Sequence, residues 1–203
     1  MVWNEEIKKE IPKGWRVDNI YSIANLINGL ACQKYPPKKG EDSLPVVKIK
    51  EMHNGLTDET ERVSFNIPDK HVIDNGDVLF SWSATLEVMH WHGGKAGLNQ
   101  HIFKVVPTNE FPIEYIYHQL SDYVITFRKL ALARKTTMGH ITADHIYQSR
   151  IVLATLPVVK EYKRIVGPLY KEIDSLQREN IKLASLRDYL LPLLMNGKAT
   201  ISD

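Results

Sequence analysis

Hydrophobic positions repeat most regularly in the last quarter of the chain. Between Leu156 and Gly197, leucines recur every seven residues, and a second series of mostly apolar residues runs in the intervening register. An apolar repeat of this kind, sustained over about four heptads, predicts a long helix that packs on another helix. We call its residues the predicted seam: Val166, Leu169, Ile173, Leu176, Asn180, Leu183, Leu190 and Leu194.

The ends of this helix are marked by residues with known preferences. Pro157 suits a first helical turn, because a proline has no N–H and the N–H groups of the first turn have no partner within the helix. Gly197 provides the left-handed residue that often follows a helix, and Pro192 is expected to kink or stop the helix about one turn earlier. From Val158 to Leu191 such a helix measures about 50 Å at about 1.5 Å per residue. This length is typical of a spacer.

The predicted seam has two possible partners. Asn180, and Arg187 in the same register, place polar groups in the seam, where they restrict register or partner at a cost in stability. Because the chain contains no second heptad stretch, we expect the seam to pair with another chain and to hold a homodimer. The alternative is a helix that folds back on its own globular domain.

The first three quarters of the chain alternate short strand-like and helical patterns, which predicts an α+β domain. Helical spacing of isoleucines predicts a helix over 20–29, and a second helix with one buried face begins at Pro112. Short runs of apolar and β-branched residues predict the strands. One short strand begins at Trp15, and the others cover 45–49, 78–80, 100–106 and 150–154.

Several polar residues beside the predicted strands are candidates for DNA contact. Asn75-Gly76 signals a turn before the strand 78–80, and this strand leads into a loop with small hydroxyl groups. In the strand 45–49, alternation of side chains places two lysines on one side. A glutamine such as Gln100 can make a bidentate pair with adenine. The candidates in these regions are Lys48, Lys50, Ser81, Ser83 and Gln100.

The densest positive charge follows the second predicted helix. The run from Arg128 to Lys135 contains four basic residues and no acidic one, and a loop rich in hydrogen-bonding groups comes next. Basic side chains hold phosphates, and neighbouring polar groups can reach bases. We therefore add further DNA-binding candidates: Arg134, Lys135, Thr136, Thr137 and His140. A solvated helix end is the alternative explanation.

Composition limits the class of protein. The 203 residues are 43% hydrophobic and 25% charged, enough for one globular domain and an appendage. A net charge of +2 does not indicate a generally basic nucleic-acid binder, so DNA affinity would depend on local clusters. The single Cys32 cannot form an internal disulfide, which suggests a reducing compartment. With no run of about 18 apolar residues and no leader-like start, we expect a cytoplasmic protein without a membrane segment.

Motifs of common enzymes are absent from the sequence. It contains no glycine-rich dinucleotide loop, no phosphate loop and no Gly-x-Ser-x-Gly elbow. His90 and His92 offer two metal ligands, whereas zinc sites use three or four. Asp69 with Glu161 and Lys163 imitates a metal-dependent nuclease pattern, but these residues lie far apart in sequence. We predict no catalytic residue, no cofactor and no metal; a metal-dependent nuclease or other metalloenzyme is the alternative.

Four segments, in this order, carry a resemblance to a known family. The segments 11–15 (IPKGW) and 74–81 (DNGDVLFS) are followed by 156–166 (LPVVKEYKRIV) and 186–197 (LRDYLLPLLMNG). Together they resemble the specificity subunits of type I restriction-modification enzymes: the entrance of the target recognition domain, its central strand, and the spacer helix. Tyr162 stands where that family usually has glutamine, and Trp82 where arginine is frequent.

The resemblance implies a non-catalytic protein that reads double-stranded DNA. Such subunits hold modification (methyltransferase) subunits, while separate restriction subunits translocate and cut DNA. A full specificity subunit has two recognition domains and two antiparallel spacer helices, whereas this chain has one of each. We therefore expect a half subunit that binds a bipartite site as a homodimer, with a recognition domain over 1–156 and a spacer helix over 157–203. A coiled-coil scaffold without DNA affinity is the third possibility.

Overall fold

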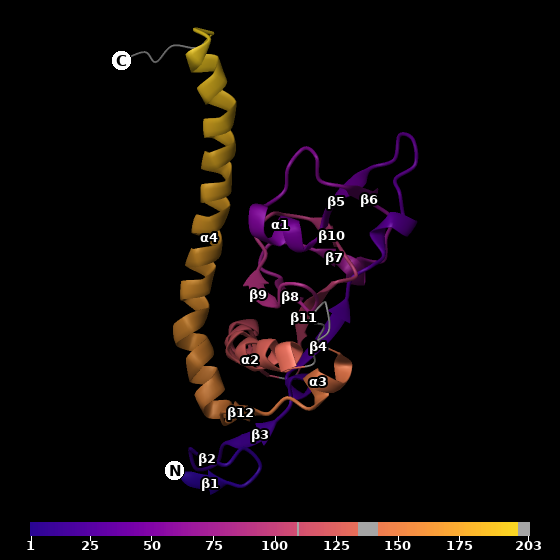
Figure 1. The fold of residues 1–203 in the computed structure, drawn as a ribbon. Coiled ribbons are helices and arrows are strands. Elements are labelled where there is room, and N and C mark those ends of the chain that lie inside the picture. Colours follow the sequence, from indigo (N-terminus) through magenta and orange to yellow (C-terminus); the bar gives the residue numbers. More distant parts are fainter. Residues whose placement is uncertain (109, 134–141, 199–203) are drawn as a thin grey trace, which may run out of the picture.

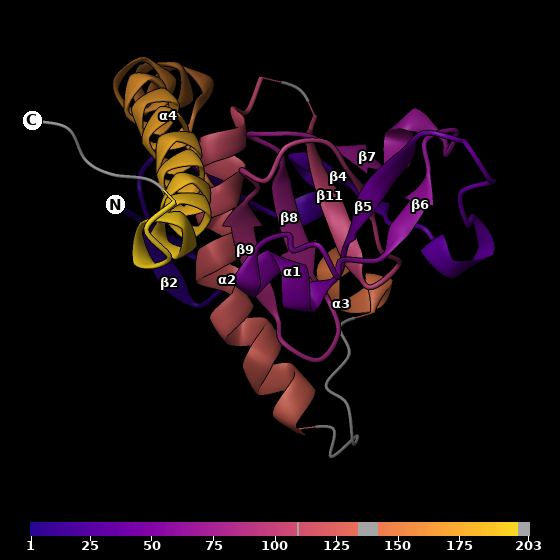
Figure 2. The same ribbon diagram turned by 90° about the horizontal axis from the view of Figure 1, so that it is seen from above.

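The chain forms a globular domain with one long helix running along its side. The computed structural model describes residues 1–108, 110–133 and 142–198. Figure 1 shows helix α4 (Leu156–Met195) beside the domain, with its C-terminal end reaching past it. Seen from above, α4, helix α2 (Ile113–Ala133) and the sheets follow one another as successive layers (Figure 2). Helix α2 therefore separates α4 from most of the sheet structure.

The domain mixes short strands with short helices, as the sequence predicts for the α+β class. Beside α2 it contains two short α-helices, α1 (Ile49–Asn54) and α3 (Ala143–Tyr147). Single 3-10 turns are η1 (Ile20–Ser22), η2 (Cys32–Lys34) and η3 (Asp69–His71). The strands are β1 (Val2–Asn4), β2 (Lys9–Ile11), β3 (Arg16–Asp18), β4 (Ala24–Asn28), β5 (Ser43–Val47), β6 (Arg62–Ser64), β7 (Val72–Ile73), β8 (Val78–Ser81), β9 (Glu87–His90), β10 (Ala96–Leu98), β11 (Ile102–Pro107) and β12 (Ile151–Leu153).

Strands β4 to β11 form two four-stranded sheets, and the chain passes from one sheet to the other several times. One sheet has the order β6-β5-β10-β7 and the other β4-β11-β8-β9. The Asn75-Gly76 turn does not close a hairpin, since β7 belongs to the first sheet and β8 to the second. The sheets meet where Gly29 passes Asn99: a Cβ at Gly29 would lie 2.1 Å from the Asn99 carbonyl oxygen. Only glycine fits such a close backbone approach.

Helix α2 covers the second sheet and completes the main core. Its apolar residues at three- and four-residue intervals, among them Ile116, Leu120 and Phe127, are fully buried. Phe127 stacks on Phe80 of β8, with ring centroids 6.0 Å apart. The first turn of α4 adds Val159 to the same cluster. The periodicity that predicts α2 is therefore the pattern that buries it.

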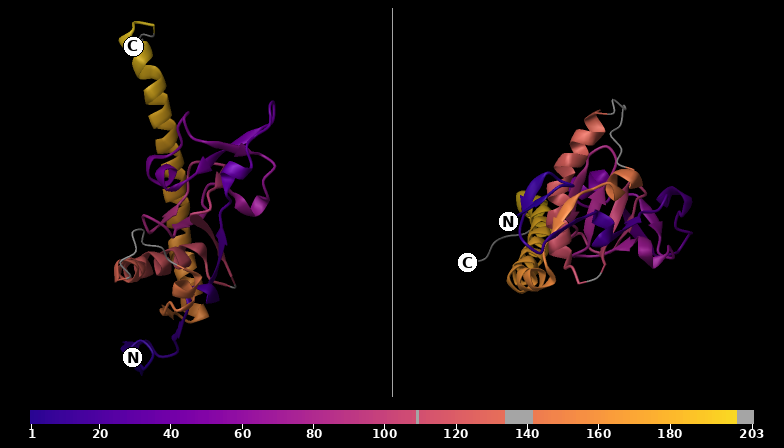
Figure 3. Two further views of the ribbon diagram at one scale, coloured as in Figure 1. Left: turned by 45° about the vertical axis from the view of Figure 1, so that its right-hand side comes forward. Right: turned by 90° about the horizontal axis from the view of Figure 1, so that it is seen from below.

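The two ends of the domain sequence meet in a two-stranded ribbon. Strand β12 pairs antiparallel with β3, so that Val152 lies opposite Val17. The β1–β2 hairpin extends from the same end of the molecule, opposite the C-terminal end of α4 (Figure 3). An ion pair between Glu6 and Arg150 links the turn of this hairpin to the residue before β12. The globular domain is thus closed just before α4 begins.

The prediction of a helix over 20–29 is wrong. Ile20 lies in the 3-10 turn η1, and Ala24–Asn28 forms strand β4, which pairs with β11. Ile20, Ile23 and Ala24 are all buried, so the apolar pattern correctly marks core positions. The spacing arises from a turn followed by a strand, and the ladder to β11 is a long-range interaction that local periodicity cannot reveal.

Two further strand boundaries differ from the prediction. Strand β5 ends at Val47; Lys48 is the N-cap of α1 and Lys50 lies within that helix, so strand alternation does not orient these two lysines. Gln100 lies in the turn between β10 and β11, because β11 begins only at Ile102. By contrast, the buried strand β8 and strand β12 occur where the sequence predicts them.

The long helix is confirmed, and its start and end are close to the predicted ones. Thr155 is the N-cap and Pro157 lies in the first turn. At the other end Gly197 has a φ of 63°, and the N–H groups of Gly197 and Lys198 bond to the carbonyls of Leu194 and Leu193, which is a Schellman motif. Helix α4 does not stop at Pro192, and it contains a second internal proline, Pro168. Within the described residues, no helix is both long and apolar enough to cross a membrane.

Candidate nucleic-acid interface

Helix α4 contacts the domain along one line of residues that is polar and aromatic. Val159 is buried near the start of this line, and the Tyr162 ring meets the edge of Tyr115 at 5.6 Å between centroids. About two helical turns after Tyr162, the Tyr170 hydroxyl lies 2.8 Å from His118 Nε2. Asp174 Oδ1 lies 2.9 Å from His92 Nδ1. The helix therefore does lie against its own domain, as the alternative in the sequence analysis has it.

The predicted seam occupies a different face of α4. At about 100° per residue, it runs about a quarter of a turn away from the line that contacts the domain. Leu176 and Leu183 are 50% and 55% exposed, and Leu169, Ile173, Asn180 and Leu194 are exposed as well. Val166, which lies one turn from both Tyr162 and Tyr170, is half-buried, as is Leu190. The contact with the own domain leaves most of the predicted seam open for another helix.

A cluster of histidine and tyrosine rings lies between β9, α2 and α4. The His90 ring is 4.5 Å from Tyr117 of α2 and 4.9 Å from Tyr170 of α4, measured between centroids. Burial, and next the neighbouring His92, lower the pKa of His90 from 6.5 to about 4. His90 is therefore neutral at physiological pH. Its Nε2 atom is buried and has no hydrogen-bond partner among the described residues.

A second polar and aromatic surface, which we call the Trp82 surface, consists of Asn28, Trp82, Gln100 and His101. The half-buried Trp82 ring lies 5.6 Å from the His101 ring, and its Nε1 donates to Asn28 Oδ1 at 3.2 Å. Gln100 Nε2 is 3.4 Å from His101 Nε2. These residues come from β4, the loop after β8 and the turn before β11. The sequence predicts a role for Gln100 but gives no signal for Asn28 and His101, since only the fold brings these residues together.

The other candidates in the first sheets and loops are less accessible than the sequence suggested. Ser81 and Ser83 are buried, and the Ser81 hydroxyl donates to the carbonyls of Ser83 and Thr85 within its own loop. Lys48 pairs with Glu61. Lys50 is exposed but shares a small pocket with Glu51, Glu59 and Glu61. These four residues therefore support the structure or stand among acidic groups, and we do not carry them into the contact surface proposed below.

The basic candidates after α2 lie outside the described residues: Arg134, Lys135, Thr136, Thr137 and His140. The described part of the same segment begins with Arg128 and Lys129, both exposed near the end of α2. The Arg128 guanidinium donates to the Leu86 carbonyl from Nε at 3.1 Å and from an Nη at 2.7 Å. Leu86 belongs to the loop that carries Trp82. Arg128, the first residue of the basic segment, is thus bonded to the loop that carries Trp82.

The metal-site alternative finds no support in the geometry. His92 is paired with Asp174, and the His90 and His92 rings stack with centroids 6.4 Å apart. Over residues 1–108, 110–133 and 142–198, no three His, Cys, Asp or Glu side chains form a group that could hold a metal ion. Glu161, part of the nuclease-like pattern, pairs with Arg164 on the exposed side of α4. Burial raises the pKa of the Cys32 thiol to about 11, which keeps it a poor nucleophile.

Comparison with known proteins identifies the family of the chain. Residues 12–185 match the model of the type I restriction modification DNA specificity domain. The chain belongs to this family. It is 26% identical over 199 residues to the type I restriction enzyme HindI specificity subunit of Haemophilus influenzae, covering 93% of this chain and 42% of that protein. It is 23% identical to the EcoBI specificity subunit of Escherichia coli, covering 95% of this chain and 41% of that protein.

Solved structures support the fold at low sequence identity. The S subunit of a type I restriction-modification system from M. genitalium matches with a TM-score of 0.56 and 12% identity, over 88% of this chain and 45% of that one. A chain from a study of complex assembly and conformational transition of the type I R-M system matches with a TM-score of 0.52 and 17% identity, over 90% and 45%. The chain spans less than half the length of these relatives.

Proposed function

We propose that the chain is a DNA-reading module of a type I restriction-modification specificity subunit and carries out no catalysis itself. The match of residues 12–185 to the DNA specificity domain is the observation that carries this proposal. The expected partners are double-stranded DNA, modification (methyltransferase) subunits and restriction subunits. We keep the division into a recognition domain over 1–156 and a spacer helix over 157–203 as part of the proposal.

The proposed DNA contact surface combines the segment from Arg128 to Thr142 with the adjacent Trp82 surface. Exposed Lys129 and the basic residues that follow it supply the charge that holds phosphates. The Trp82 surface supplies amide, imidazole and indole groups, of which amides and imidazoles can hydrogen-bond to base edges. The bond from Arg128 to Leu86 connects the two parts. Phosphate contacts and base contacts would then come from neighbouring elements.

Salt dependence of binding tests this surface. If Lys135 contacts a phosphate, Lys135→Ala weakens binding to all DNA sequences, and the slope of log K against log salt becomes shallower by about one. The measurement uses the chain assembled with its modification subunits. Lys182→Ala, on the face of α4 that is remote from both the domain and the predicted seam, is the matched control. An unchanged slope in the Lys135 variant moves the phosphate contact elsewhere.

We further propose that a second copy of the chain covers the predicted seam. The exposed leucines of α4 support this pairing, because a stripe of large apolar side chains this long is unusual on a protein surface without a partner. Antiparallel pairing about a two-fold axis would place the two recognition domains at opposite ends. Identical domains related in this way read the same bases on opposite strands, so the preferred site is an interrupted palindrome.

Lengthening the helix tests the two-fold arrangement. Seven residues inserted between Lys182 and Leu183 keep the heptad phase and extend each helix by about 10 Å, or about three base pairs at 3.4 Å each. Selection of bound sites from random DNA by the assembled complex is expected to return the same half-sites with a longer gap. An asymmetric site, or the original gap in a correctly assembled insertion variant, would contradict the arrangement.

A further inference from the structure

Helix α4 has a weak point between its two contacts with the domain. Pro168 has no N–H and cannot bond to the carbonyl of Arg164, and its ring crowds the preceding turn, so the helix is weakened at this position. The preceding Gly167 adds backbone freedom, and a Cβ built on it would meet no atom within 4 Å. No packing requirement explains this glycine. At Gly167-Pro168 the helix can therefore change direction more easily than at an uninterrupted turn.

Contacts on the two sides of this weak point differ in kind. Before it, Val159 is buried in the main core and fixes the first turns of α4 to the domain. After it, α4 contributes ring contacts and polar pairs rather than a buried core residue: Tyr170 lies against His90 and its hydroxyl is 2.8 Å from His118, and Asp174 pairs with His92 at 2.9 Å. Arg178, one turn further along α4, pairs with the same carboxylate at 2.7 Å. The first contact anchors the helix, and the second determines where the rest of it points.

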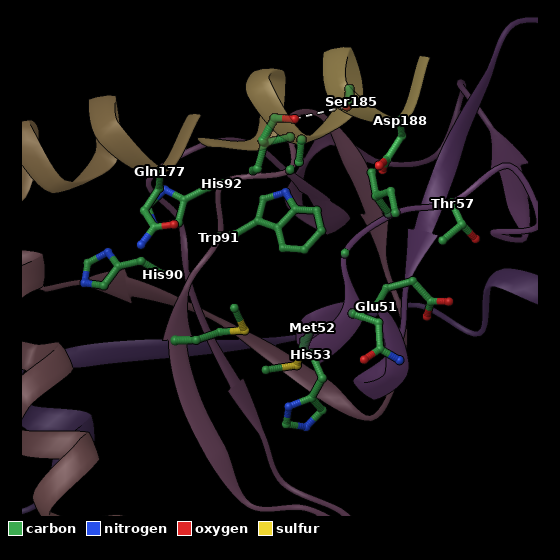
Figure 4. A pocket seen from close by; sticks show the side chains of 17 residues that line it. Glu51, Met52, His53, Thr57, His90, Trp91, His92, Gln177, Ser185 and Asp188 are labelled. Atoms are coloured by element: carbon green, nitrogen blue, oxygen red, sulfur yellow. Dashed lines mark hydrogen bonds between the residues drawn. The ribbon is translucent and has the colours of Figure 1, made fainter. Parts of the chain in front are cut away.

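The helix beyond Asp174 has no tight packing against the domain. Among the described residues, the side chains of α4 that follow Asp174 make hydrogen bonds only within the helix. Arg178 donates to the Asp174 carbonyl, and Ser185 donates to the Ile181 carbonyl. Opposite this part, a cleft of about 560 Å³ separates α4 from α1 and the loop of Trp91. Figure 4 shows Gln177, Ser185 and Asp188 on one side of the cleft and Met52 and His53 on the other. The direction of the last turns thus depends on contacts made earlier along the helix.

We propose that the pairs His92–Asp174 and Tyr170–His118 hold the distal half of α4 in one direction relative to the recognition domain, and thereby set the distance between the two DNA half-sites. These four residues act as positioning residues and touch no DNA. The inference rests on the proposed function, because a half-site distance exists only if two recognition domains are joined through α4.

A small change of direction has a measurable effect on the far end of the helix. From Pro168 to Met195 the helix extends about 40 Å at about 1.5 Å per residue. A tilt of about 10° at this point moves its end by about 7 Å, which is about two base pairs at 3.4 Å each. Loss of the two polar contacts is therefore expected to let the complex accept several gap lengths, without any change in the half-sites that it reads.

Distances between spin labels test the positioning role without DNA. Labels are attached to cysteines replacing the exposed Glu59 in the domain and Tyr189 near the end of α4, and labelled chain is diluted with an excess of unlabelled chain. The native Cys32 is buried and does not compete. The distribution of distances is expected to broaden in the double variant Asp174→Asn with Tyr170→Phe. Glu161→Gln, which breaks an exposed ion pair on the same helix, is the matched control and leaves the distribution unchanged.

A rescue variant tests the weak point itself. Gly167→Ala with Pro168→Ala restores an uninterrupted helix, so in the background of the double variant it is expected to narrow the distance distribution again. If the double variant leaves the distribution unchanged, the positioning role is wrong. If the distribution broadens and the rescue variant fails to narrow it, Gly167-Pro168 is not the place where the helix bends, and that step is wrong.

Selection of bound DNA then tests the link to half-site distance. With the assembled complex, the double variant is expected to return the wild-type half-sites with gaps spread over about one or two base pairs on each side. Wild-type half-sites at the original single gap, in a variant whose label distances have broadened, would overturn this link. If the wild-type complex selects no DNA at all, the proposed function fails, while the label distances still decide the positioning role.

Discussion

The two faces of helix α4 differ in the residues that form them and in the kind of contact that these residues can make. The face toward the domain is made of tyrosine, aspartate and valine, and its contacts are specific pairs such as Asp174 with His92. The predicted seam is made almost entirely of leucine and isoleucine, and most of it is exposed. A polar pair fixes the direction of one element relative to another through a few atoms. An apolar stripe adds binding free energy only when a partner buries it. One helix thus carries a contact with its own domain and, about a quarter of a turn away, the face that we propose pairs with a second chain.

The largest expected effect comes from charges placed in the seam. Leu176→Glu with Leu183→Glu removes four leucines per dimer, each worth about 1.5–3 kcal/mol when buried, so the dissociation constant is expected to rise more than about 1,000-fold. Light scattering at micromolar concentration should report monomers. Because these leucines do not contact their own domain, its thermal unfolding should be unchanged.

A control pair shows whether position rather than charge causes this effect. Ser175→Glu with Lys182→Glu has the same spacing on the opposite side of α4 and should leave the dimer intact. A double leucine variant that still forms dimers would exclude the seam as the dimer interface. A large loss of domain stability in that variant would mean that the two faces are not independent.

A smaller effect is expected on the face toward the domain. Val159 is 1% exposed, so Val159→Ala removes two methyl groups from the core and should cost about 2 kcal/mol of unfolding free energy. Dimer formation should not change. The neighbouring Val158 is 45% exposed, and Val158→Ala is expected to cost less than about 0.5 kcal/mol. Denaturant unfolding measures both values, and equal costs would contradict the assignment of the two positions.

The smallest predicted effect is a pH dependence that arises from His90. Its pKa is about 4 in the folded chain and 6.5 when unperturbed, so the unfolded chain binds more protons between these values. The free energy of unfolding should therefore fall as the pH drops from 6.5 toward 4, and His90→Gln should remove this loss. The ring is only partly buried, so we expect about 1 kcal/mol rather than the full linkage value.

The pH experiment also has a matched control. His53 is exposed and pairs with Glu87 at 3.1 Å. His53→Gln should therefore leave the pH-dependent loss between pH 6.5 and 4 in place. If His90→Gln follows the wild-type curve across this range, the histidine and tyrosine cluster between β9, α2 and α4 is hydrated, and His90 is charged on acidification without a loss of stability.

Local patterns were sufficient to predict the long elements. Helices α2 and α4 each repeat their apolar residues over several turns, and strand β8 is a short run of fully buried residues. Segment 20–29 was misassigned because the partner of β4 is β11, far away in sequence. Pro168 was overlooked because the seam residues around it keep their period. Patterns thus predict which residues are buried more reliably than which element they form.

The candidate sites were harder to predict because they combine distant residues. His92 and Asp174 lie 82 residues apart in sequence, and only the spacing of Tyr162, Tyr170 and Asp174 along α4 signals a second face. Ser81 and Ser83 are candidates because of their hydroxyl groups, but both residues are buried and the Ser81 hydroxyl bonds within its own loop. Composition cannot tell an available hydroxyl from one that already has a partner.

The ribbon of β3 and β12 has a consequence for the order of events during synthesis. Strand β3 cannot pair until β12, the last strand of the domain, has been synthesised. Pairing between strands so far apart in sequence is typical of domains that fold in milliseconds to seconds. The 40 residues of α4 come directly afterwards and take about 2–8 s to translate at about 5–20 residues per second. The domain therefore has time to close before its leucine stripe is complete. Newly made chains would then meet through finished helices, and not through the exposed interior of half-folded domains.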